Sequence, residues 1–302
     1  MVSILLILLC ASLFSGIVTR TRSILSKRKG PRILQPLYNI RLLLRKGSVF
    51  SVTGSVVTQV APTAALAATF TAALMIPFGK HSPALFSFDA DFVMFAYLLA
   101  LARFACIANA LDSGGAFQGL GASREALFSL LVEPAFFIIM GSLALLTDNS
   151  SFSDIMYNFR NDGINGTIMG MLAAFVLFNL LIIETGRIPV NDSNTHLELT
   201  MIHEAMLLDN SGFDLALMQI GNLLKFAIFS TLIATCVISQ NLSAPQYLLW
   251  FLVVQLLCAA AVGTFESFRP RYSMLKNPSY MLAVSSIAFI AFLAAVALNI
   301  II

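Results

Sequence analysis

The chain has 302 residues, of which 58% are hydrophobic and 11% are charged, with a net charge of +3 and a mean hydropathy of +0.87. This composition excludes a soluble globular domain. Apolar runs of about twenty residues recur along the chain, long enough to cross a hydrocarbon layer about 30 Å thick, whereas a strand barrel would show short alternating segments. The sequence therefore predicts an all-α polytopic membrane protein with one transmembrane domain, residues 1–302.

Eight apolar runs are candidate transmembrane helices. They lie at about 2–19, 56–77, 91–111, 126–147, 166–185, 215–238, 243–265 and 279–301. The first is not a cleavable signal, because no positive residue precedes it and five follow within ten residues of its end. Its N-terminus is therefore expected outside, and an even number of spans also places the C-terminus outside.

Alternating spans place four segments inside: about 20–55, 112–125, 186–214 and 266–278. They hold nine, one, one and three of the eighteen Lys and Arg residues, respectively, whereas the outside loops hold only Lys80 and Arg160. This positive-inside bias supports the expected orientation. We expect a multi-pass protein of the cytoplasmic (inner) membrane.

The first inside segment joins a basic stretch to an amphipathic one. Arg28, Lys29 and Arg32 form a candidate surface for docking a partner. In the following residues, Ile33, Leu37, Ile40 and Leu44 fall near one helical face, with Arg41 and Arg45 elsewhere. This pattern predicts an amphipathic helix at the membrane interface. Contact with lipid head groups and docking of a soluble partner both remain open.

The third and fourth spans carry charges at membrane depth. Arg103 lies eight residues from the end of its span, where an unpaired guanidinium costs at least about 2.5 kcal/mol. The obvious partner is Glu133, in the next span, eight residues beyond Glu125. The two glutamates are candidate successive stations for a proton, and Pro134 frees a backbone carbonyl nearby. A purely structural Arg103–Glu133 pair remains the alternative.

The densest group of ionisable residues follows the fifth span. Glu184 and Arg187 are three residues apart, close enough to pair on one helical face, and Pro189 stops the helix. A plausible short helix, 194–208, lies within the loop that follows. The sequence from His203 to Leu207 lacks the second histidine of a zinc-protease helix. We therefore predict a water-filled entrance at the inner face of the membrane, lined by ionisable groups, instead of a metal site. Its candidate residues are Asp192, His196, Glu198, His203, Glu204 and Asp209.

Further along, Lys225 is a second deep cation, which either pairs with a buried acid or titrates. Glu266 and Arg269 have the spacing of a structural ion pair.

The four cysteines all lie within apolar runs and have no Cys-x-x-Cys spacing, so packing is their predicted role. The chain shows no nucleic-acid motif and no phosphate-binding glycine loop. The candidate ion pathway from the residues alone is Arg103, Glu125, Glu133, Glu184 and Lys225.

Several motifs, in order over nearly the whole chain, carry a family resemblance. They are Arg28-Lys-Gly-Pro, Leu111-Asp-Ser-Gly-Gly-Ala-Phe, Gly121-Ala-Ser-Arg-Glu-Ala, Val132-Glu-Pro, Glu184-Thr-Gly-Arg-Ile-Pro-Val and Asp209-Asn-Ser-Gly. The set resembles the family of respiratory complex I subunit 1, which forms the quinone site and membrane anchor. It is most similar to the membrane subunit of energy-converting nickel–iron hydrogenases, the formate hydrogenlyase subunit 4-like branch.

The resemblance implies a membrane anchor that docks a soluble electron-transfer arm and couples redox chemistry to H⁺ or Na⁺ movement, without catalysing electron transfer itself. Glu133 would match the family's mid-membrane glutamate, and Glu184 and Arg187 its Glu-x-x-Arg-x-Pro element. Glu198, Glu204 and Asp209 would match its acidic loop. The implied partners are hydrogenase large and small subunits, a ferredoxin-like iron–sulfur subunit and antiporter-like membrane subunits. Iron–sulfur clusters and the nickel–iron centre would lie in those partners, with no cofactor in this chain.

One departure from the complex I pattern helps to distinguish two candidate functions. Complex I proteins typically read Phe-Asp after Arg-x-Pro, whereas this chain reads Val190-Asn-Asp192 and continues with a longer loop that contains histidines. This favours a hydrogenase-type complex over the alternative, a quinone-site subunit that contributes directly to catalysis. A quinone site should show a partly apolar tunnel from the lipid to the 186–214 loop.

Overall fold

A computed structural model describes residues 2–78, 84–159, 163–191, 202–239, 242–270, 272 and 276–301. Within these ranges the chain forms helices and no strand. The helices are α1 (Val2–Leu25), α2 (Gln35–Leu44), α3 (Val56–Leu74), α4 (Asp91–Asp112), α5 (Ala116–Thr147), α6 (Phe152–Asn158), α7 (Gly163–Glu184), α8 (His203–Met206), α9 (Gly212–Val237), α10 (Ala244–Phe268) and α11 (Asn277–Ile301). The all-α prediction is confirmed.

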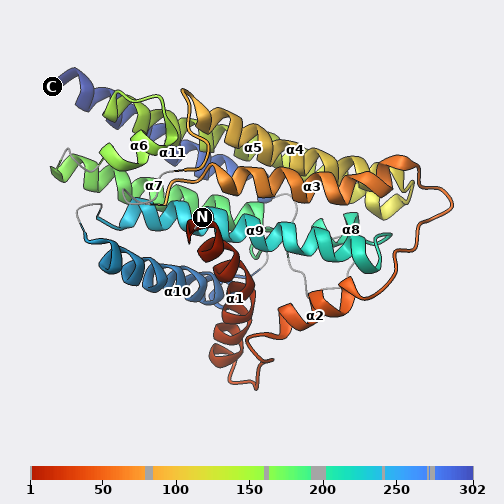
Figure 1. Ribbon diagram of the computed structural model, residues 1–302. Coiled ribbons are helices and arrows are strands. Elements are labelled where there is room, and N and C mark those ends of the chain that lie inside the picture. The colour runs from red at the N-terminus through yellow and green to blue at the C-terminus, as the bar shows by residue number, and fades with distance from the viewer. Residues whose placement is uncertain are drawn as a thin grey trace.

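Seven helices in the described ranges are long and apolar enough to cross a membrane, namely α3, α4, α5, α7, α9, α10 and α11. They correspond to the last seven predicted spans and run in broadly the same direction (Figure 1). The first predicted span, 2–19, lies within α1, which crosses that direction. The prediction of a polytopic membrane protein is therefore confirmed.

Helix α9 is the central element of the bundle. Of its apolar window, 78% is buried, against 28% in α11. It packs against α7, α3, α1, α2 and α10. In a membrane bundle an apolar helix face can meet lipid or protein, so it is the number of neighbouring helices, and not hydropathy, that makes α9 central. A charged side chain on α9 is consequently enclosed by protein.

The described parts of the predicted inside segments meet at one end of the bundle, here called the loop end. Asp112, the last residue of α4, accepts hydrogen bonds from the backbone and hydroxyl of both Ser55 and Thr58, at 2.7–3.1 Å. It thereby caps the start of α3, whose first N–H groups have no helical partner. Nearby, Ser211 bonds both backbone groups of Val49.

Helix α5 begins earlier than predicted. The glycine-rich segment was expected to be a loop ending at 125, but the helix starts at Ala116 and runs for 32 residues. Gly121 explains part of this difference, because a side chain there would meet the Ile202 carbonyl oxygen at 2.8 Å. The glycine permits close packing of α8 on α5 and does not mark a loop. As a result, Glu125 and Glu133 lie on one continuous helix.

The predicted amphipathic helix is present as α2, but its buried face differs from the expected one. Ile40 is buried against the protein, whereas Ile33 and Leu44 are exposed. The side packed on the bundle is formed by Pro36, Leu37, Ile40 and Leu43. The leucine-rich sequence offers apolar residues on several faces, so its pattern alone does not identify the one that packs on α9.

Candidate functional site

Arg103 lies at the centre of a three-helix charge cluster. It projects from α4 and is 5% exposed. Its Nη1 donates to Glu133 Oε1 on α5 at 2.7 Å, and its Nη2 donates to Glu184 Oε1 at the end of α7 at 2.5 Å. The predicted Arg103–Glu133 pair is confirmed as a contact, and Glu184 is a further partner that the sequence did not identify. One guanidinium thus binds two carboxylates.

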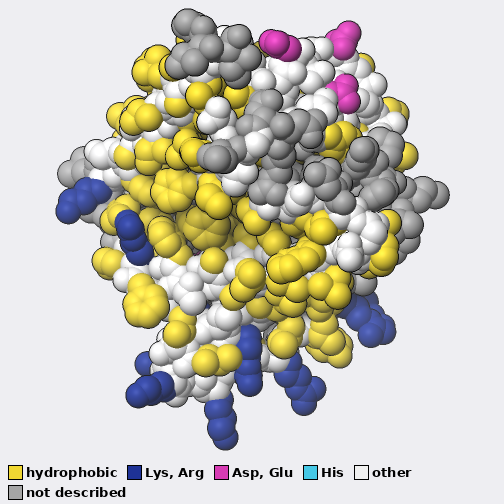
Figure 2. Space-filling model, turned by 90° about the vertical axis from the view of Figure 1, so that its left-hand side faces the viewer, with side chains coloured by type: hydrophobic (Ala, Val, Ile, Leu, Met, Phe, Trp, Pro, Cys, Tyr) yellow, Lys and Arg dark blue, Asp and Glu magenta, His cyan; other side chains and the backbone are white. Residues whose placement is uncertain are grey.

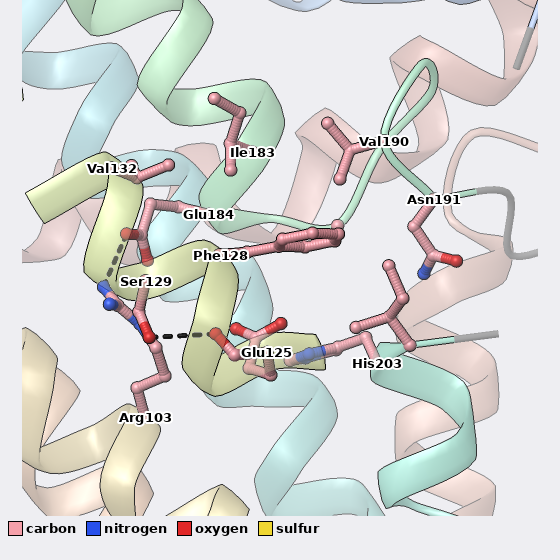
Figure 3. A pocket seen from close by; sticks show the side chains of 12 residues that line it. Arg103, Glu125, Phe128, Ser129, Val132, Ile183, Glu184, Val190, Asn191 and His203 are labelled. Carbon is pink, nitrogen blue, oxygen red and sulfur yellow. Dashed lines mark hydrogen bonds and ion pairs between the residues drawn. The ribbon is translucent and has the colours of Figure 1, made fainter. Parts of the chain in front are cut away.

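A small cavity adjoins this cluster toward the loop end. Its volume is about 20 Å³, and its lining includes Arg103, Glu125, Glu184, Asn191 and His203. A cavity needs roughly 10–15 Å³ to hold one water molecule, so this one has room for a single water. Figure 3 shows the side chains of Glu125 and His203 pointing toward each other within it.

Two further cavities share lining residues with the first. The second, about 70 Å³, shares Arg103 and Glu184 with the first and adds Glu133 among mainly apolar and aromatic neighbours. The third, about 20 Å³, shares His203 with the first and adds Lys225. Neighbouring cavities thus share ionisable side chains, and their linings together include residues from Glu133 to Lys225.

Lys225 is buried on α9, beside Thr69, Cys106 and Asn222 in the third cavity. No carboxylate in the described part of the chain lies within ion-pair distance of its amine. The structure therefore separates Lys225 from the Arg103 cluster, and its predicted pairing with a buried acid finds no partner among those residues.

Glu133 differs from Glu184 in exposure. Its side chain is 42% exposed in the isolated chain, whereas that of Glu184 is 8% exposed. It lies midway along α5, and the side chain one turn earlier, Leu130, is 73% exposed on the same side. Glu133 therefore reaches the outer surface of the bundle at membrane depth.

Two ion pairs suggested by sequence spacing do not form. Gly186 has φ +60° and turns the chain after α7, so Arg187 leaves the helical face of Glu184. Its Nη1 instead contacts Glu266 on α10 at 3.0 Å, with its guanidinium 5.0 Å from the ring centre of Phe226. The predicted Glu184–Arg187 pair is wrong because a turn interrupts the helical spacing on which it relied.

The predicted Glu266–Arg269 pair is also wrong. Glu266 faces inward and receives Arg187, with Arg22 of α1 at 3.9 Å. Arg269 follows the end of α10, where it donates to the Tyr272 hydroxyl at 2.5 Å and lies over the Phe265 ring. The long-range partner of Glu266 could not be read from local spacing.

The loop residues are only partly described. Asp192, His196 and Glu198 lie outside the described residues. The Asn191 side chain donates to Glu204 Oε2 at 2.7 Å, which connects the end of the 186–191 turn to α8. Asp209 is exposed, as are the predicted docking residues Arg28, Lys29 and Arg32. Of the helix predicted at 194–208, residues 194–201 lie outside the described residues, and the described part is helical over α8, which ends at Met206.

Within the described ranges, no group of three or more His, Cys, Asp or Glu side chains is arranged to hold a metal ion.

Comparison with known families gives a match over residues 1–298 to the family described as NADH dehydrogenase. The chain belongs to this family, that of complex I subunit 1. The resemblance stated from the motifs is thereby confirmed.

Two relatives come from Escherichia coli (strain K12). The chain is 31% identical to hydrogenase-4 component C over 228 residues, 75% of this chain and 70% of that protein. It is 28% identical to formate hydrogenlyase subunit 4 over 311 residues, 98% of each. The chain is thus a complex I-like membrane subunit related to hydrogenase membrane subunits.

A solved structure has the same fold. It is a chain of the membrane-bound sulfane sulfur reductase, an archaeal respiratory membrane complex, with a TM-score of 0.80 and 20% identity. The match covers 97% of this chain and 98% of that one.

Proposed function

We propose that this family member is the ion-translocating membrane anchor of a membrane-bound nickel–iron hydrogenase-type oxidoreductase. In this proposal it docks the soluble electron-transfer arm at the loop end and transfers no electrons itself. Nickel–iron and iron–sulfur centres belong to its partner subunits. The observation that carries the proposal is the line of cavities and ionisable side chains from Lys225 and His203 through Arg103 to Glu133. The names of the two bacterial relatives support the hydrogenase branch.

The transported ion fits H⁺ better than Na⁺. Arg103 occupies the centre of the line, and its guanidinium already binds the carboxylates of Glu133 and Glu184. A Na⁺ ion would have to displace this guanidinium, and Lys225 adds an amine further along. A proton needs only an acceptor oxygen or a water molecule. With both carboxylates ionised, the cluster carries one excess negative charge, which one bound proton removes.

The exposure of the Glu133 side chain supports a partner subunit within the membrane. A carboxylate that is 42% exposed at membrane depth cannot face hydrocarbon at low cost. An adjoining membrane subunit with a polar or ionisable group would cover it and receive the proton. Antiporter-like membrane subunits have this chemistry. In this scheme Arg103 orients Glu133, and Glu125 and His203 pass protons between the first cavity and the loop end.

None of the three cavities lined by described residues is large enough for a quinone, and residues 192–201 of the loop to which its tunnel would lead lie outside the described ranges. Each of the three is smaller than the roughly 150 Å³ cavity that encloses a single benzene ring. A quinone ring carries additional oxygens and substituents, so none of the three accommodates it.

Purification of the tagged chain in mild detergent tests the proposal. Copurifying subunits are identified by mass spectrometry, and the preparation is assayed for viologen reduction by hydrogen and for quinone reduction. We expect nickel–iron subunits, hydrogen activity and no quinone reduction. A nickel-free complex that reduces quinone would overturn the hydrogenase assignment in favour of the alternative. The same preparation from a strain without the nickel-containing subunit serves as the control.

A further inference from the structure

Helix α2 presents an apolar stripe to its surroundings. Leu34, Tyr38 and Leu42 succeed one another at intervals of four residues, which places them along one side of the helix. They are 42%, 52% and 57% exposed. The opposite side, around Ile40, packs on the bundle. Three large apolar side chains in one row are costly to leave in water.

Arginine side chains lie on the same side of α2. Arg41 and Arg45 are seven and eleven residues after Leu34, close to two and three helical turns, and both are exposed. The whole segment 20–46 holds nine Lys and Arg residues and no Asp or Glu. Figure 2 shows Lys and Arg side chains gathered along the lower edge of the molecule, the region of α1 and α2 in Figure 1.

Both ends of α2 are held against neighbouring helices by close backbone contacts. Ahead of the helix, the Ile33 carbonyl lies against Gly16, where an added Cβ would meet its oxygen at 1.8 Å. Gly16 is four residues before Arg20, the first charged residue of α1. Behind the helix, the Gly47 carbonyl lies against Gly212, the first residue of α9, where a Cβ would meet it at 2.2 Å.

We propose that this outer face of α2, formed by Leu34, Tyr38, Arg41, Leu42 and Arg45, binds anionic phospholipid at the membrane surface. The apolar stripe enters the boundary of the acyl chains, and the two guanidinium groups hold lipid phosphates. Charge complementarity carries this assignment. The face holds two exposed guanidinium groups and no acid, which matches an anionic head-group layer.

Lipid binding by the full-length chain provides the first test. The chain is purified in mild detergent, and native mass spectrometry measures binding of phosphatidylglycerol and of phosphatidylcholine with the same acyl chains. Each arginine near an anionic surface contributes about fivefold in affinity, so Arg41→Gln/Arg45→Gln should weaken phosphatidylglycerol binding roughly 30-fold. Arg28→Gln/Lys29→Gln removes the same charge from the linker and should retain most of the binding.

Equal affinity for the two lipids, or equal losses in the two double variants, would overturn the proposal.

A second test does not depend on the arginines. The four native cysteines are buried, so a spin label can be attached selectively to Leu42→Cys, with Lys29→Cys as a linker control. The chain is placed in vesicles of two parts phosphatidylcholine to one part phosphatidylglycerol, and collisions with oxygen and with a water-soluble nickel complex are compared.

We expect oxygen to reach the label at position 42 more readily than the nickel complex does, and the reverse at position 29. Nickel access equal to that at position 29 would refute lipid contact. The measurement is repeated on the complex with its copurifying subunits. If both collision reagents are excluded from position 42 there, the face docks a protein subunit and the proposal is wrong.

Discussion

Replacing Arg103 with glutamine probes the charge cluster most sharply. Arg103→Gln leaves Glu133 and Glu184 without the guanidinium that they bind at 2.7 and 2.5 Å. Removing one partner of a buried ion pair costs about 3–5 kcal/mol. Glu133 is partly exposed and both carboxylates can take up a proton, so we expect the lower end of that range. The quantity measured is the free energy of unfolding in bicelles, with Arg32→Gln at an exposed site as a control expected to change it by less than about 0.5 kcal/mol.

A double-mutant cycle isolates the Arg103–Glu184 contact. Glu184→Gln alone leaves Arg103 paired with Glu133, and in Arg103→Gln/Glu184→Gln the buried carboxylate without a partner is removed together with the arginine. The loss in the double variant should be smaller than the sum of the single losses by about 1–3 kcal/mol. Additive losses, or an Arg103→Gln protein as stable as the wild type, would refute the reasoning.

The remaining predictions concern the starts of α3 and α9 and the buried Lys225. Asp112→Ala removes the carboxylate that caps α3, so the midpoint of thermal unfolding should fall, whereas Asp209→Ala at an exposed site should leave it unchanged; equal midpoints would contradict the capping role. Gly212→Ala should destabilise the protein by at least about 1–2 kcal/mol, since Gly212 has φ +54° and lies against the Gly47 carbonyl. Gly47→Ala meets nothing within 4 Å and should be nearly neutral, so a similar loss in both variants would count against the close approach. Lys225→Met should slow proton translocation in vesicles while subunit assembly is retained, and an unchanged rate would remove Lys225 from the pathway.

Much of the transmembrane architecture is predictable because hydrocarbon thickness fixes the length of apolar runs. The depth of Arg103 likewise required an acidic partner, and Glu133 in the next span was the nearest acid at similar depth. These inferences use only chain position and solvation cost, which a sequence contains. They therefore agree with the seven described spans and with the Arg103–Glu133 contact.

Contacts between distant segments are less accessible to sequence reasoning. Arg103 and Glu184 are 81 residues apart along the chain, and their contact depends on α4, α5 and α7 meeting at one point. The Arg187–Glu266 pair depends on the turn at Gly186, which removes Arg187 from the helix. Asp112 was conspicuous in a glycine-rich motif, but its role as a cap appears only when α3 is placed beside α4. The number of residues between two charges predicts their contact only within an uninterrupted helix.

The most direct test of ion translocation compares the wild type with Glu133→Gln in the purified complex, reconstituted into sealed vesicles. Hydrogen-dependent electron transfer and internal pH are recorded together, and Glu133→Asp serves as the control that retains a carboxylate. We expect Glu133→Gln to assemble and transfer electrons at the normal rate without forming a pH gradient, and Glu133→Asp to retain part of the gradient. A normal gradient in Glu133→Gln would contradict the proposed pathway.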